Sequence, residues 1–355
     1  MPSAARPLPD TANAFDALRC LLAVAVVYSH TFFLGGYPQE PFLALTKGQA
    51  IVGELAVLGF FGLSGYLVTA SYTRSRGLLD YFSKRVRRIL PGFWACLVVT
   101  AFAISPAIFL LSHGSLGDFR WFGGDSSALS YVVANLAIKV NNWNIDGVLV
   151  HATYGDSLNG SLWSLWPETL CYVIVALLGA AGFFARHRPV LLLGVAALFV
   201  LHAAHVLLPA LEAPVLPTWL VLVDRGRYVL AYLVGTVLWL WRDRLTPDRP
   251  SALVVLVALA ALARFGGLQL LAPLIIPLAL VLIGHCFTLR LRHDVSYGLY
   301  IYGFPVQQLL AATPLPRFPW PVFLAASLVI TFIFAFVSWR FVELPFLRRR
   351  TIAPQ

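Results

Sequence analysis

Apolar residues recur along the chain in long runs that are separated by short polar segments. Most runs are about 20 residues long, the length with which a helix crosses the hydrocarbon core of a bilayer. The pattern therefore predicts an all-α, polytopic membrane bundle of about ten transmembrane helices. The expected spans are residues 15–34, 51–72, 91–111, 161–184, 190–208, 226–242, 251–266, 268–288, 295–312 and 320–342.

Composition supports lipid as the main solvent of this chain. Hydrophobic residues make up 59% of it and charged residues 12%, whereas soluble domains carry about 25% charged residues. The net charge of +10 fits basic cytoplasmic loops better than a nucleic-acid surface. The four cysteines form no CxxC pair, so we expect neither a metal site nor a disulfide framework.

The basic residues also predict an orientation. If the N-terminus lies inside, most of the 26 Lys and Arg residues fall on the cytoplasmic side, as the positive-inside rule requires. Both termini are then cytoplasmic, with tails at 1–14 and 347–355 around a membrane domain at 15–346. The one long loop, at about 112–160, lies outside. Its Trp, Asn and Gly content suits a sugar-like acceptor, and the alternative is an interfacial cap anchored by tryptophans.

The first predicted helix carries three ionisable residues, Asp16, Arg19 and His30. His30 lies eleven helical steps after Arg19, which is about three turns and a rise of about 16 Å. All three side chains therefore share one stripe, and charge within a span is costly unless it faces the bundle interior. Histidine is suited to accept a proton near neutral pH. The alternative is a structural, hydrogen-bonded histidine.

A second intramembrane acid, Glu168, lies near the outer end of the fourth span at a depth compatible with His30. A carboxylate bonded to one imidazole nitrogen would fix the tautomer and leave the other nitrogen as a base. Asp16 is a second candidate for this orienting role. The alternative for Glu168 is a buried ion pair with an arginine such as Arg227.

Six cations lie between Arg74 and Arg88, in the predicted cytoplasmic segment before the third span. Arg85 and Arg88 are three residues apart and point the same way on a helix. Arginine binds phosphates through two parallel hydrogen bonds, so the pair suits a nucleotide-linked donor such as coenzyme A. On charge alone, an orientation signal or a contact to anionic lipid explains the cluster better, and only the family resemblance described below favours the donor. Farther along, Arg340 and Glu343 are spaced to form an ion pair.

Taken together, four groups of residues resemble the acyltransferase-3 family of bacterial membrane proteins. They are Phe15–Arg19 followed by His30; Phe60–Leu67 with Tyr81–Pro91; Leu162–Leu165 with Glu168 and Tyr172; and Ser296–Tyr300 with Phe304, Pro305 and Arg340–Phe346. These groups run in order along nearly the whole chain. Each group alone is weak evidence for the family, whereas the four groups together are specific to it.

The resemblance implies an acyltransferase of the bacterial plasma (inner) membrane. It implies acyl-CoA, commonly acetyl-CoA, as the cytoplasmic donor and the hydroxyl of a glycan or glycoside as the outer acceptor, with no metal. His30 and Arg19 match the essential pair of the family, and Arg85 and Arg88 match its presumed donor-binding pair. Trp163, Ser64 and Tyr297 fall in matched motifs and are expected to contact substrate.

Two positions depart from the family pattern. Gly303 stands where many members have histidine, and Leu58 stands where many have an acid, for which Glu54 is one turn away. A different class of function also fits the sequence, because intramembrane His, Arg and Asp build proton pathways in transporters and flippases. Membrane lipid is an expected partner in either case, and the sequence predicts no oligomeric state.

Overall fold

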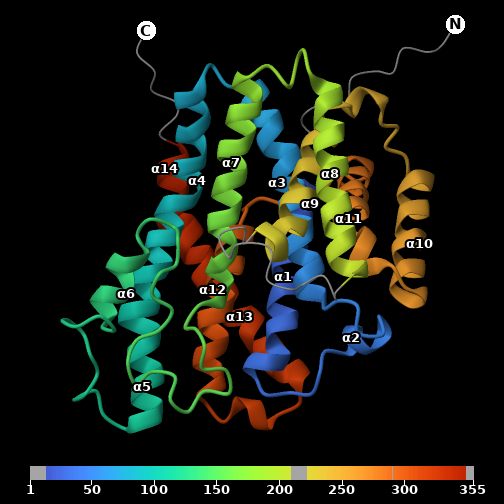
Figure 1. The fold of residues 1–355 in the computed structure, drawn as a ribbon. Helices are drawn as coiled ribbons and strands as arrows, with labels where there is room; N and C mark the ends of the chain where they lie inside the picture. The colour runs from blue at the N-terminus through green and yellow to red at the C-terminus, as the bar shows by residue number, and fades with distance from the viewer. Residues whose placement is uncertain (1–12, 209–221, 290, 349–355) are drawn as a thin grey trace, which may run out of the picture. The chain divides into compact units, whose positions relative to one another are not determined.

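The computed structural model describes residues 13–208, 222–289 and 291–348 (Figure 1). Over these residues the chain is all-helical and has no strand, which confirms the predicted fold class. Most of the predicted tails, residues 1–12 and 349–355, lies outside the described residues. The α-helices are α1 (Phe15–Leu34), α2 (Pro41–Leu45), α3 (Val52–Thr73), α4 (Leu78–Val99), α5 (Ser105–His113), α6 (Ala128–Asn135), α7 (Leu165–Ala180), α8 (Arg188–Leu207), α9 (Leu222–Leu240), α10 (Arg249–Phe265), α11 (Leu268–Cys286), α12 (Ser296–Ala311), α13 (Trp320–Ser338) and α14 (Leu344–Arg348).

Every one of the expected apolar segments is helical in the structure. Among the described residues, seven helical stretches are long and apolar enough to cross a membrane: Phe15–Leu34, Val52–Thr73, Leu78–His113, Gly160–Ala180, Arg188–Leu207, Leu268–Cys286 and Trp320–Leu347. The helices α9, α10 and α12 are shorter candidates for the remaining spans. The total of about ten spans and the orientation of the termini stay predictions.

The third predicted span differs most from expectation. Its helix begins at Leu78 rather than at residue 91, and it runs through Pro91 into a short π-helix, η1 (Thr100–Ile104), and then into α5. The charged residues between Leu78 and Pro91 are therefore helical, whereas Arg74 and Arg76 lie in the turn before α4. A helix that projects from the membrane needs no apolar surface, so an apolar run marks only the part of a helix that lies in lipid.

The described residues form two compact units. In the first, made of residues up to 22, 41–78 and 167–292, α3 packs against α9 and α11, and α8 packs against α9 (Figure 1). Glycines allow these helices to approach closely. A Cβ on Gly65 would meet the backbone carbonyl of Tyr232, and a Cβ on Gly235 would meet the carbonyl of Gly62. Small residues at such interfaces are typical of helix packing within membranes.

The second unit contains residues 23–40, 79–166 and those from 293 onward. Its central helix, α12, is buried along most of its length and packs against α13, against α5 and against a 3-10 turn, η2 (Gly160–Ser164). The chain between α5 and η2 forms the long loop predicted at about 112–160, and it contains the short helix α6.

Candidate functional site

His30 lies on α1 among aromatic side chains of the second unit. Its ring packs edge-on against Phe33 at 5.3 Å and against Phe304 of α12 at 5.1 Å. Tyr154 of the long loop packs on Phe33 at 5.2 Å and on Phe304 at 6.0 Å. We call Phe33, Tyr154 and Phe304 the aromatic cluster of His30. The Nδ1 atom of His30 is buried and has no hydrogen-bond partner among the described residues.

Two consecutive glutamines of α12 hold this arrangement in place. The Gln307 amide donates to the backbone carbonyl of Val27 at 3.0 Å and to the Thr31 hydroxyl at 3.1 Å, which fixes α12 to α1 beside His30. The Gln308 amide donates to the carbonyls of Tyr154 at 2.9 Å and Ser157 at 2.8 Å. Neither residue was predicted from the sequence, although a pair of buried amides inside an apolar segment is itself an unusual signal.

Glu168 and Ser64 are brought together in the first unit. The Glu168 Oε1 atom accepts one hydrogen bond from the Ser64 hydroxyl at 2.6 Å and another from the Tyr172 hydroxyl at 2.6 Å. Arg227, the alternative partner for Glu168, donates to Glu54 at 3.1 Å instead. Hydroxyl groups rather than a cation therefore hold the Glu168 carboxylate. The orientation of His30 by Glu168 or Asp16 stays a prediction.

The two arginines of the predicted donor-binding pair lie partly buried on α4, whereas Arg87 between them is exposed. Arg88 already has acidic neighbours: its Nη2 lies 2.5 Å from Asp294, and its Nη1 lies 4.0 Å from the buried Glu343. Arg340, the expected partner of Glu343, lies over the ring of Phe341 instead. The reason is a π-helix, η7 (Trp339–Glu343), because its wider turn changes which residues share a face.

Tyr297 is buried at the start of α12, and its hydroxyl donates to the carbonyl of Ile89 at 3.0 Å. Its ring fills the space above Gly92, where a Cβ would meet it. This contact joins α12 to α4 next to Arg88. The hydroxyl of Tyr297 is thus engaged within the protein, and its predicted contact to substrate stays a prediction.

The remaining predicted residues lie on two elements. Asp16 and Arg19 are partly exposed near the beginning of α1, which is unbroken as far as His30, as the stripe requires. Trp163 is partly buried in η2. Within the described ranges, no group of three or more His, Cys, Asp or Glu side chains is placed to hold a metal ion.

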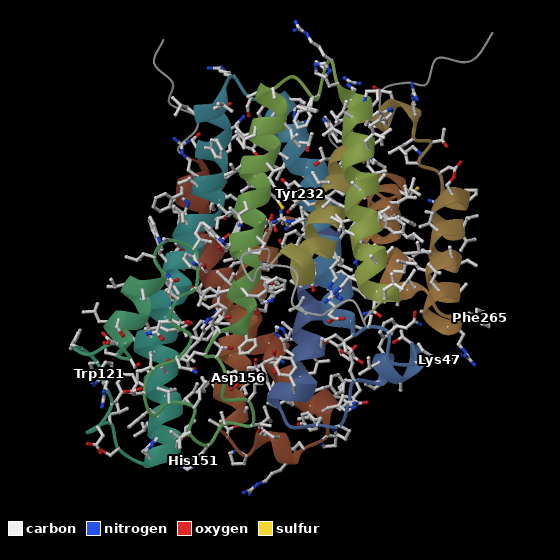
Figure 2. The ribbon with its side chains drawn as sticks, viewed as in Figure 1. Lys47, Trp121, His151, Asp156, Tyr232 and Phe265 are labelled. Carbon is white, nitrogen blue, oxygen red and sulfur yellow. The ribbon has the colours of Figure 1, made fainter. Side chains whose placement is uncertain are left out.

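The long loop is tied down by its own side chains. Arg120 and Asp146 form an ion pair at 2.8 Å, and the ring of Trp121 stacks on Phe102. Figure 2 labels Trp121, His151 and Asp156 of this loop. The Asn135 side chain accepts from the backbone of Asn141 and donates to the carbonyl of Asn142. Several of the amides that suited sugar binding are therefore used to order the loop itself.

The Gly303 departure has a packing counterpart. A Cβ at this position would meet the Cγ2 atom of Val27, which lies one turn before His30 on α1. A histidine side chain at 303 would need this space, so the close approach of α1 and α12 here depends on the glycine.

Comparison with known proteins adds an independent observation. The acyltransferase domain family matches residues 12–340 of the chain. An "O-acetyl transferase" of Shigella phage Sf6 is 31% identical over 352 residues, which cover 95% of this chain and 96% of that protein. "Nodulation protein 10" of Rhizobium leguminosarum bv. viciae is 27% identical over 366 residues, 96% of this chain and 94% of that protein. A Bacillus subtilis (strain 168) protein, provisionally named a peptidoglycan O-acetyltransferase, is 26% identical over 374 residues, 93% of this chain and 54% of that protein. No solved structure matches the chain.

Proposed function

This chain belongs to the acyltransferase domain family and is an acyltransferase, and from this premise we propose that it O-acetylates a glycan or glycoside from cytoplasmic acetyl-CoA. The names of two relatives, an O-acetyl transferase and a peptidoglycan O-acetyltransferase, support acetyl as the group and a glycan as the acceptor. The apolar helices support a multi-pass membrane location, for which we propose the bacterial inner membrane.

The state of His30 is the observation that best supports this proposal. A structural histidine inside a protein normally has both ring nitrogens hydrogen-bonded, yet the buried Nδ1 of His30 has no partner among the described residues. The aromatic cluster fixes the ring plane without using either nitrogen. A rigid imidazole with an unengaged nitrogen is suited to meet a group that the substrate supplies.

We assign His30 the role of general base. It takes the proton of the acceptor hydroxyl while that oxygen attacks the thioester carbonyl carbon. The new ester C–O bond forms, the C–S bond breaks, and the imidazolium returns its proton to the departing thiolate. An acyl-histidine intermediate balances equally well, with the imidazole nitrogen as the first nucleophile. In both routes the acceptor leaves as an ester and the donor leaves as a free thiol.

The donor end of the proposal rests on Arg85, Arg88 and Arg19. Arg85 and Arg88 are partly buried on the same side of α4, and Arg19 lies near the beginning of α1. We assign the phosphate binding to both arginines of this pair, and Arg88 also connects the pair to Asp294 and Glu343.

The proposal is tested by His30→Ala in the full chain reconstituted into liposomes. We expect acetyl-CoA consumption, measured as free thiol together with acetyl transfer to glycan, to fall by about 10²–10⁴-fold, the usual cost of losing a positioned base. His202→Ala is the matched control, since this histidine lies on α8 and bonds to the carbonyl of Gln269. Near-normal thiol release in His30→Ala would contradict the base assignment, and a wild type that releases no thiol would favour a transporter.

A further inference from the structure

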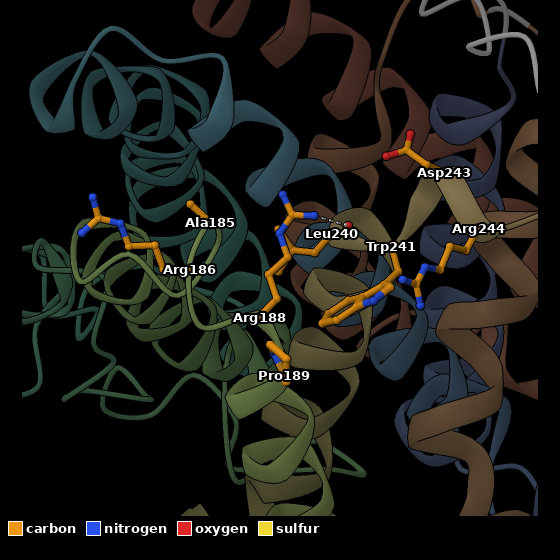
Figure 3. Close-up of a pocket in the computed structure, with 8 residues that line it drawn as sticks. All are labelled: Ala185, Arg186, Arg188, Pro189, Leu240, Trp241, Asp243 and Arg244. Carbon is orange, nitrogen blue, oxygen red and sulfur yellow. Dashed lines mark hydrogen bonds between the residues drawn. The ribbon is translucent and has the colours of Figure 1, made fainter.

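A basic pocket lies in the first unit and is lined by none of the residues that the proposed reaction uses. It has a volume of about 310 Å³ and is formed by the turn between α7 and α8, by the end of α9 and by the short helix η5 (Arg242–Arg244). Figure 3 shows Arg188 and Trp241 in the middle of the lining, Arg186 at one side of it, and Asp243 and Arg244 at the other. Three cations and one acid give the lining an excess of positive charge.

The pocket is held in shape by Arg188. Its Nε donates to the carbonyl of Phe184 at 2.6 Å and its Nη1 donates to the carbonyl of Leu240 at 3.4 Å, which joins the beginning of α8 to the end of α9 (Figure 3). Arg186 and Arg244 are exposed, and among the described residues their hydrogen bonds are made by the backbone N–H, to Gly182 and Trp241, and not by the guanidinium. Asp243 has Arg242 as a basic neighbour at 3.9 Å, which leaves the two exposed arginines free for an added anion.

The surface beside the pocket indicates what kind of anion it receives. α8 starts at the pocket, and its first turns expose apolar side chains: Val190 is 47% exposed, Leu192 44% and Leu193 70%. In a helix of this apolarity such a surface lies against lipid chains. A ligand that places a phosphate in the pocket can therefore lay hydrocarbon along α8, which a water-soluble phosphate cannot do.

We propose that this pocket binds the phosphodiester head group of an anionic phospholipid of the adjoining leaflet, which is the cytoplasmic leaflet in the predicted orientation. Arginine matches phosphate oxygens in a bidentate manner, and basic pockets between transmembrane helices are a known mode of head-group recognition. The volume of about 310 Å³ is near the lower limit of ligand pockets, about 300 Å³, which suits a head group better than a whole nucleotide-linked thioester.

The test measures retention of single lipids on the purified full-length chain by native mass spectrometry. We expect wild-type protein to retain phosphatidylglycerol in preference to phosphatidylcholine. The double variant Arg186→Gln/Arg244→Gln should lose about 30-fold in phosphatidylglycerol affinity, since each arginine at an anionic lipid surface contributes a factor of roughly five. The matched control is Arg249→Gln/Arg292→Gln, which removes the same charge from exposed arginines that do not line the pocket. Its affinity should stay within about twofold of wild type.

Two results would overturn the proposal. Equal losses of affinity in the two double variants would assign lipid retention to diffuse attraction between a basic surface and lipid. Displacement of phosphatidylglycerol by ADP at matched concentration would assign the pocket to a soluble phosphate ligand. If the double variant Arg186→Gln/Arg244→Gln does not fold, a second variant keeps the proposal testable. Asp243→Asn removes the acid of the lining, and we expect it to increase the retention of phosphatidylglycerol roughly fivefold. No increase in a folded Asp243→Asn protein would count against the pocket.

Discussion

The carboxylate of Asp294 lies 2.5 Å from the guanidinium of Arg88 on α4, and it also accepts hydrogen bonds from the backbone N–H and the hydroxyl of Ser296, the first residue of α12. Arg88 therefore connects two helices through an acid that was not predicted from the sequence. Arg85 is its partner in the predicted donor-binding pair, and Arg88 lies between Asp294 and Glu343. The two arginines should consequently respond differently to the same substitution.

We expect Arg85→Gln to raise the KM for acetyl-CoA by about 10-fold or more, because a charge-assisted hydrogen bond contributes roughly 1.5–3 kcal/mol. The kcat should change little, since phosphate binding is made equally in the ground state and the transition state. Initial rates of thiol release against acetyl-CoA concentration measure both constants. An unchanged KM in a folded protein would remove Arg85 from the donor site.

Arg88→Gln should instead lower the thermal stability. The guanidinium contacts the carboxylates of Asp294 and the buried Glu343, and a hydrogen bond to a charged group contributes about 1.5–3 kcal/mol. The melting temperature in detergent should fall by several degrees, measured beside Arg87→Gln, which removes an exposed neighbour. If Arg88→Gln melts like Arg87→Gln and changes only KM, the guanidinium serves the donor rather than the fold.

Glu168 gives the second test of the proposed chemistry. Removing its charge with Glu168→Gln should reduce acetyl transfer by about 10–100-fold if the carboxylate orients the base, the usual cost of losing such a supporting group. Tyr172→Phe removes one of the two hydroxyls that hold Glu168 and should reduce transfer only severalfold. Rates of acetyl incorporation into glycan give the comparison.

A matched control for these variants is Thr69→Val on α3. It removes a buried hydroxyl that bonds to Thr236 and does not reach Glu168. Wild-type rates in folded Glu168→Gln protein would mean that Ser64, Glu168 and Tyr172 serve packing between helices. A rate loss in Thr69→Val as large as that in Tyr172→Phe would mean that any lost hydroxyl disturbs this unit.

The apolar pattern predicted helix ends well where the whole helix is apolar. The predicted segment 51–72 is the helix Val52–Thr73, and 268–288 is Leu268–Cys286. The pattern failed where charge and helix coexist, because α4 begins at Leu78, ahead of the apolar run. The π-helix over Trp339–Glu343 was also invisible in the sequence, since no residue type specifies it.

Side-chain partners were harder to predict than elements. The stripe of Asp16, Arg19 and His30 required only one unbroken helix, which α1 provides. The hydrogen bonds from Gln307 to Val27 and from Gln308 to Tyr154 and Ser157 each join residues more than 150 positions apart. Helical periodicity carries no information about such pairings. The same holds for Arg88, whose acidic neighbours lie beyond residue 290.

The long loop offers a test of its anchoring. Gln308→Leu removes the amide that donates to the carbonyls of Tyr154 and Ser157, and each lost bond leaves a carbonyl without its partner. We expect the loop between α5 and η2 to be cleaved several times faster by limited proteolysis, and acetyl transfer to fall because Tyr154 packs on Phe304. Gln39→Leu, an exposed glutamine, is the control. Equal cleavage rates in the two variants would assign the anchoring of the loop to other contacts.

The close approach of α3 and α9 explains why position 65, which follows Ser64, is a glycine. A Cβ at Gly65 would meet the backbone carbonyl of Tyr232, and a backbone atom, unlike a flexible side chain, has no rotamer into which it can move. Gly65→Ala must therefore push the helices apart, and overpacking of this kind costs about 1–3 kcal/mol. The displacement also strains the hydrogen bond from Ser64 to Glu168, so acetyl transfer should fall together with the melting temperature.

Gly194→Ala on α8 is the matched control for this substitution, since a Cβ at Gly194 would have nothing within 4 Å. There the same chemical change removes the entropic cost of glycine in a helix, about 1 kcal/mol, and the melting temperature should stay level or rise. A thermal-shift series in one detergent, with transfer rates on the same preparations, measures both variants. If Gly65→Ala is as stable as Gly194→Ala, the backbones of α3 and α9 do not meet at Gly65, and the position of Ser64 relative to Glu168 must be set by other contacts.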